Sequence, residues 1–170
     1  YIVCPPPDDA ACQRWPGLRA IESMKPLLGY YDERSPEVAD WHISWALQHG
    51  ISWFAVDWYW NQGEEFINEA LDEGLMNSRF FDQMKFCIHW CNQDPNCTTF
   101  RAYDYSPETL RELAATLCDR YFSRENYLTV DGKPVFMIFQ PVSLINDNGG
   151  FEQAKEALNA MEEEVRQRGF

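Results

Sequence analysis

The sequence predicts an α/β protein built from parallel (β/α) units that form the N-terminal half of a (β/α)8 TIM barrel. Short apolar runs alternate with amphipathic helical stretches, no glycine-rich phosphate loop follows an expected strand, and polar or aromatic residues end three of the strands. Side chains at the C-terminal ends of the strands form the ligand site of such a barrel. Four expected strands cannot close a barrel, so we expect the remaining half from the same longer chain.

The first expected elements are a strand end and a capped helix. Tyr1 to Cys4 is apolar and is stopped by three prolines, which cannot donate to a strand ladder. An irregular stretch over residues 8–25 follows, and long loops after strands are more often functional than idle. The run Ser35-Pro36-Glu37 then predicts a helix, because serine caps the free amides, proline fits the first turn, and glutamate suits its positive end. We expect this helix to end at Gly50.

The central strand is expected within GISWFAVDWYW, residues 50–60. Ile51 to Val56 has the composition of a strand buried on both faces, and it leads directly into Asp57 and an aromatic run. Because side chains alternate along a strand, Asp57 and Tyr59 should share one face, with Trp58 and Trp60 on the other. The alternative is that these aromatic residues are core and that Asp57 caps a helix.

The later elements continue the alternation. We expect, in order, a helix over Glu64–Leu75, a strand over Met84–Trp90, a helix headed by Ser106-Pro107-Glu108, a tight turn at Val130–Lys133, a strand over Val135–Phe139 and a helix over Phe151–Arg168.

Composition narrows the partners of this chain. With 27 acidic and 14 basic side chains among 170 residues, the formal charge is −13, which argues against nucleic acid and anionic membranes. No apolar run approaches the roughly 20 residues of a membrane span. Seven tryptophans suit a ligand with sugar rings, although a large aromatic core would give the same count. We expect residues 1–170 to be a single, partial domain.

The residues after the strands predict a site for oligosaccharide or polysaccharide. His89, Asn92 and Gln93 offer donors and acceptors without net charge, which suits hydroxyl-rich ligands, although a hydrogen-bonded core histidine is the alternative. Trp60 and Trp90 are the expected stacking platforms. The full set expected to line the sugar subsites is Asp57, Tyr59, Trp60, His89, Trp90, Asn92, Gln93 and Gln140.

The catalytic residues stay unassigned. Glycosidic cleavage usually needs two carboxylates about 5 to 9.5 Å apart, and Asp57 and Asp94 are the candidates at strand ends. A zinc site built from Cys87, His89 and Cys91 is conceivable, but ligands two apart on one strand rarely converge on one ion, so we expect no metal.

Four segments in order resemble the glycoside hydrolase family 99-like proteins, which include endo-α-mannosidases and WbsX-like proteins. The segments are KPLLGYYDERSPEV (25–38), ISWFAVDWYW (51–60), FCIHWCNQ (86–93) and VDGKPVFMIFQP (130–141). The resemblance implies a (β/α)8 barrel that acts on a complex glycan without metal or other cofactor, with catalytic glutamates partly or wholly on later strands.

This chain departs from that family at one position. WbsX-like relatives carry a glutamate where this chain has Gln93, and an amide cannot serve in acid/base catalysis. A catalytically inactive glycan-binding barrel is therefore the alternative to a hydrolase, and a structural protein with an aromatic core is the third class. Six cysteines permit disulfides without setting their pairing, and we expect an extracytoplasmic location, periplasmic or secreted.

Overall fold

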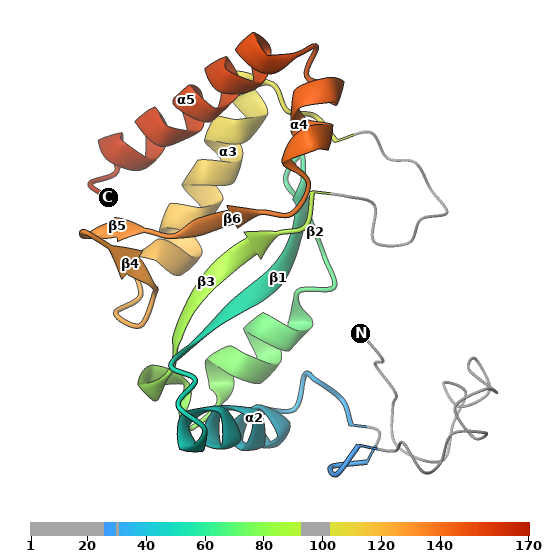
Figure 1. Ribbon diagram of the computed structural model, residues 1–170, viewed down its shortest axis with the longest axis vertical. Coiled ribbons are helices and arrows are strands. Elements are labelled where there is room, and N and C mark those ends of the chain that lie inside the picture. The colour runs from blue at the N-terminus through green and yellow to red at the C-terminus, as the bar shows by residue number, and fades with distance from the viewer. Residues whose placement is uncertain (1–25, 30, 93–102) are drawn as a thin grey trace, which may run out of the picture. The chain divides into compact units, whose positions relative to one another are not determined.

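The computed structural model describes residues 26–29, 31–92 and 103–170. The chain divides into two compact units, the first made of Tyr1–Ile51 with Glu69–Phe81 and the second of Ser52–Asn68 with Asp82–Phe170 (Figure 1). The expected strand at Tyr1–Cys4 and the loop over 8–25 lie outside the described residues. In the described part of the chain, no helix combines the length and the apolar character needed to cross a membrane.

The first unit contains helix α2 (Pro36–Gln48), the π-helical turn η2 (Ala70–Gly74) and the 3₁₀ turn η3 (Leu75–Asn77). Helix α2 begins as predicted, because the Ser35 hydroxyl accepts from the amide of Val38 and proline occupies the first helical position. Its buried Asp40 accepts hydrogen bonds from the Ser78 hydroxyl at 2.7 Å and from the Arg79 backbone amide at 2.8 Å. These bonds fix the segment after η3 to α2.

The second unit contains a sheet in the order β2-β1-β3-β6. Strands β1 (Trp53–Asn61), β3 (Lys85–Trp90) and β6 (Phe136–Ile138) are parallel, which confirms the predicted parallel α/β arrangement. Asp57 lies opposite His89, and His89 lies opposite Met137. The three strands thus bring their C-terminal ends to one edge of the sheet.

Helices cover one face of this sheet. Helix α3 (Pro107–Leu117), which continues into the π-helical turn η5 (Cys118–Phe122), packs beside helix α5 (Phe151–Gln167), and the short α4 (Pro141–Asp147) precedes α5 (Figure 1). The Trp58 indole donates to the Tyr121 hydroxyl at 3.1 Å, joining β1 to η5. The capped helix predicted at Ser106-Pro107-Glu108 is confirmed, since the Ser106 hydroxyl accepts from the amide of Thr109.

The expected helix over Glu64–Leu75 is wrong in its first part. Glu64–Phe66 is strand β2, which pairs antiparallel with the end of β1. Gln62 and Gly63 both have positive φ, the conformation that a tight hairpin turn requires. The Asn68 side chain then accepts from the backbone amide of Tyr59 at 2.9 Å and donates to its carbonyl at 3.0 Å, which holds this segment along β1.

The remaining turns follow the sequence more closely. The tight turn at Val130–Lys133 is confirmed, because Asp131 and Gly132 have positive φ and join β4 (Thr129–Val130) to β5 (Lys133–Pro134). The final helix is confirmed as α5, whereas α4 was not expected.

Candidate functional site

The two faces of the sheet carry different side chains. Because Asp57 pairs with His89 and residues alternate along each strand, Tyr59 and Cys91 lie on the same face as Asp57 and His89. The opposite face packs on the helices and holds the indoles of Trp58, Trp60 and Trp90. The polar groups and the tryptophans therefore do not line one surface.

The centre of the polar face is a pair formed by Asp57 and His89. The Asp57 Oδ1 and His89 Nδ1 atoms lie 2.9 Å apart, joining β1 to β3. Their side chains are 37% and 20% exposed, so both can reach a ligand. Here the structure brings together two of the predicted site residues, at the C-terminal ends of neighbouring parallel strands.

Cys91 and Tyr59 extend this pair into a cluster of four side chains. Cys91 is 2% exposed, and one ligand atom from each of Asp57, His89 and Cys91 lies within 4.8 Å of the others. Burial, followed by the negative charge of Asp57, raises the pKa of Cys91 to about 11. Burial also raises the pKa of the Tyr59 phenol. Cys91 and Tyr59 are thus neutral at pH 7.

Trp60 and Trp90 are placed differently from the stacking platforms that the sequence predicted. They are 1% and 0% exposed, and the Trp90 indole donates to the Trp60 carbonyl at 3.0 Å. The Trp90 ring stacks on Phe136 with centroids 6.3 Å apart and meets Tyr105 edge-on. In the described part of the chain neither indole offers an open face, because strand alternation turns both toward the helices.

Asn92 and Gln140 form a brace between two strand ends. The side-chain amide of Asn92 donates to the backbone carbonyl of Gln140 at 2.8 Å. The Asn92 side-chain oxygen accepts from the backbone amide of Gln140 at 2.7 Å. The Asn92 side chain also donates to the Tyr105 hydroxyl at 3.1 Å and is buried. Both polar atoms of Asn92 are thus used inside the protein, where they fix the start of α4. Gln93 and Asp94 lie outside the described residues.

Phe139 is a further candidate site residue that the sequence did not predict. It directly follows β6, its ring meets the His89 ring edge-on with centroids 5.5 Å apart, and it is 45% exposed. Aromatic rings that remain exposed beside hydrogen-bonding groups suit the apolar faces of sugars. The signal was present, because Phe139 ends the predicted strand Val135–Phe139, but the cross-strand register that places it beside His89 comes from the fold.

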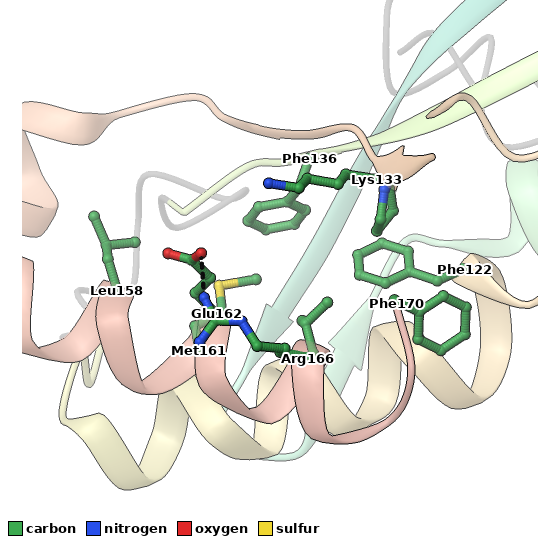
Figure 2. A pocket seen from close by; sticks show the side chains of 10 residues that line it. Phe122, Lys133, Phe136, Leu158, Met161, Glu162, Arg166 and Phe170 are labelled. Carbon is green, nitrogen blue, oxygen red and sulfur yellow. Dashed lines mark hydrogen bonds and ion pairs between the residues drawn. The ribbon is translucent and has the colours of Figure 1, made fainter. Parts of the chain in front are cut away.

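A cavity on the helix-covered side of the sheet lies away from this cluster. A cavity of about 310 Å³ is bounded by α5, by the β5–β6 segment and by Phe122 and Phe170 (Figure 2). Phe136 lines it, and Phe136 pairs with Ile88 on the helix-facing side of the sheet. The cavity is therefore separate from the cluster around Asp57 and His89.

Three similarities to known proteins bear on this site. A family model described as "Glycosyltransferase WbsX" matches residues 22–170. The uncharacterized protein WxcX of Xanthomonas campestris pv. campestris, in strain B100 and in strain ATCC 33913, is 23% identical over 124 residues, which is 67% of this chain and 17% of the relative. The GH99 endo-alpha-mannosidase from Bacteroides thetaiotaomicron, solved with BIS-TRIS-propane, is 24% identical with a TM-score of 0.52.

The extent of these matches decides what each one shows. The mannosidase match covers 74% of this chain and 37% of that structure, and at this identity it shows a shared fold. The chain spans about a sixth of the length of the curated relatives. The family model, in contrast, covers nearly the whole chain, including every strand that carries the site. This chain, whose fold is that of the GH99-like proteins, belongs to the WbsX glycosyltransferase family.

Proposed function

We propose that this chain is part of a glycoside hydrolase-like domain that acts on a complex glycan or polysaccharide at the C-terminal ends of its parallel strands. The observation that carries the proposal is the pair of Asp57 and His89, partly exposed beside the open ring of Phe139. Carboxylate and imidazole groups bind sugar hydroxyls, while an aromatic ring packs on the C–H face of a sugar. Membership of a family named for glycan chemistry and the fold of a mannosidase support the same class of ligand.

The domain we propose is a (β/α)8 barrel of which this chain supplies the N-terminal part. Strand β6 is the outer strand of the described sheet, and the apolar cavity beside it is lined by Phe136, Met161 and Val165. An unpaired strand edge next to an apolar groove is a place where a further β/α unit of a barrel can pack. We therefore assign the groove to the unit that follows α5 in the full-length protein.

The groove can be tested separately from the chemistry. Leu158 lines this groove and is exposed in this chain, so in a completed barrel Leu158→Glu would bury a carboxylate that now faces solvent. We expect the substitution to lower the unfolding free energy of the full-length protein by about 2 kcal/mol or more. Asn159→Glu, on the neighbouring exposed position of α5, is the matched control and should change it by less than about 0.5 kcal/mol. Equal, small effects of both substitutions would argue against a covered groove.

Glycan binding is tested with the full-length protein and a panel of oligosaccharides, measuring binding and product release together. We expect Phe139→Ala and His89→Gln to weaken binding of the preferred glycan about tenfold or more, the loss of roughly 1.4 kcal/mol of contact. Asn159→Ala, on the exposed surface of α5, is the control and should bind like the original protein. Unchanged glycan binding by both site variants would refute this location of the site.

A catalytically inactive glycan-binding barrel is the second candidate. The cluster around His89 contains one carboxylate, Asp57, among the described residues, whereas glycosidic cleavage usually uses two. The sequence favours the same candidate, since the resemblance to WbsX-like proteins implies a glutamate where this chain has Gln93. Binding without release of reducing ends would favour this candidate. Growth of an acceptor sugar from an activated donor would instead indicate glycosyl transfer, as the family name suggests.

A further inference from the structure

We propose that Asp57, His89 and Cys91 form a binding site for a zinc ion. A carboxylate oxygen, an imidazole nitrogen and a thiol sulfur from these residues lie within 4.8 Å of one another on one face of the sheet. The zinc site shares Asp57 and His89 with the proposed glycan site, but its test measures metal binding without any sugar, so either proposal can fail while the other holds.

The register of two parallel strands makes this convergence possible. His89 and Cys91 are two residues apart in the sequence and lie on the same face of the sheet. That spacing is about 6.6 Å along a strand, which by itself is too wide for one ion. Asp57 is the direct neighbour of His89 on β1, and strands are about 4.8 Å apart. The backbone amide of Cys91 donates to the Trp58 carbonyl at 2.9 Å, which keeps Cys91 beside the end of β1. Three positions on two strands therefore make a triangle.

The ligand types select the metal. Zinc binds thiolate, imidazole and carboxylate together, whereas magnesium and calcium prefer oxygen ligands alone. Zinc–ligand bonds of 2.0 to 2.3 Å imply ligand atoms roughly 3.3 to 3.8 Å apart in a tetrahedron. The 2.9 Å between Asp57 and His89 and the wider limit of 4.8 Å for the group bracket that range. Small side-chain rotations would bring all three ligand atoms into position.

Three protein ligands leave one position of tetrahedral zinc for water or a substrate oxygen, as in catalytic rather than structural zinc sites. The partial exposure of Asp57 and His89 provides an entry path for the ion. Cys91 is buried, and its thiol donates to the backbone carbonyl of His89 at 3.7 Å, which holds the sulfur near the other two side chains.

Binding requires one proton to leave. Cys91 carries its proton at neutral pH, and the zinc–sulfur bond forms on the thiolate, so one proton passes from the sulfur to solvent as the ion enters. A histidine that binds zinc through Nδ1 carries its proton on the other ring nitrogen. No electron transfer or further reactant is involved.

The test uses the full-length protein, depleted of metal with a chelator and titrated with Zn²⁺ alone in a calorimeter. Loss of a residue that only supports a metal ligand costs about 10- to 100-fold in affinity. Because Cys91 and His89 would bind zinc directly, we expect Cys91→Ser and His89→Gln to weaken zinc binding at least about 100-fold. Cys87→Ser is the matched control: it removes a buried thiol from β3, outside the three-residue group, and should leave the affinity unchanged.

Replacement by Co²⁺ gives a second, spectroscopic readout, and the original protein alone can already contradict the proposal. The original protein and Cys87→Ser should show a thiolate-to-cobalt charge-transfer band in the near ultraviolet, and Cys91→Ser should lack it. A cobalt complex of the original protein without this band would overturn the proposal. Equal zinc affinity of the original protein and Cys91→Ser, or no saturable binding at all, would overturn it as well.

Discussion

Replacing Trp90 by alanine distinguishes a core residue from a sugar platform. The side chain is fully buried, stacks on Phe136, and donates its indole N–H to the Trp60 carbonyl. Truncating a buried tryptophan to alanine typically costs about 3 to 5 kcal/mol, and the orphaned carbonyl adds to that loss. Such a cost is a large fraction of the roughly 5 to 15 kcal/mol that stabilises most domains.

Trp90→Phe keeps the test readable if the alanine variant does not fold. It retains most of the apolar volume and removes the N–H, so we expect a loss of about 1 to 3 kcal/mol. Trp53→Ala, at an exposed position at the start of β1, is the control and should cost less than about 1 kcal/mol.

The assay is urea unfolding of the full-length protein, analysed by linear extrapolation, with glycan binding measured on the same samples. Trp90→Ala should shift the midpoint strongly, and Trp90→Phe should bind the glycan like the original protein. An unshifted midpoint together with a tenfold loss of binding would show that Trp90 contacts sugar and that the reasoning from burial is wrong.

Two further predictions concern the first unit. Hydrogen bonding from Ser78, assisted by Arg79, holds the pKa of Asp40 below its ordinary value, so this contribution is present above the pKa of unfolded aspartate and is lost as the pH falls through the folded value. Stability, measured by circular dichroism during acid unfolding, should therefore fall less steeply with decreasing pH in Asp40→Asn. The same dependence of stability on pH in both proteins would contradict this role of Asp40. A Cβ on Gly74 would lie 2.1 Å from the Glu33 carbonyl oxygen, so Gly74→Ala should cost about 1 to 3 kcal/mol in urea unfolding. Gly50→Ala, where the added atom meets open space, should cost no more than about 1 kcal/mol through its positive φ, and an equal loss at both sites would refute the close approach.

Local signals in the sequence predicted much of the secondary structure. The Ser-Pro-Glu runs marked α2 and α3 because capping and the first helical turn depend on adjacent residues. The Asp131-Gly132 turn was predicted for the same reason, since positive φ is a property of single positions. The sequence did not predict the β2 hairpin, because the spacing of apolar residues in this segment indicates a helix. In the fold, the hydrogen bonds of Asn68 to the backbone of Tyr59 hold the segment along β1 instead.

In the candidate site, too, local sequence predicted some features and only the fold shows the others. Alternation along β1 was enough to separate Asp57 and Tyr59 from Trp58 and Trp60, because the direction of each side chain follows from the pleat of a single strand. The sequence does not tell which face of the sheet the helices cover, because that depends on how strands and helices pack. Only the fold shows that Trp60 and Trp90 lie on the helix-covered face. The meeting of Asp57 with His89, Cys91 and Phe139 likewise depends on the register between strands far apart in the chain, which no local pattern encodes.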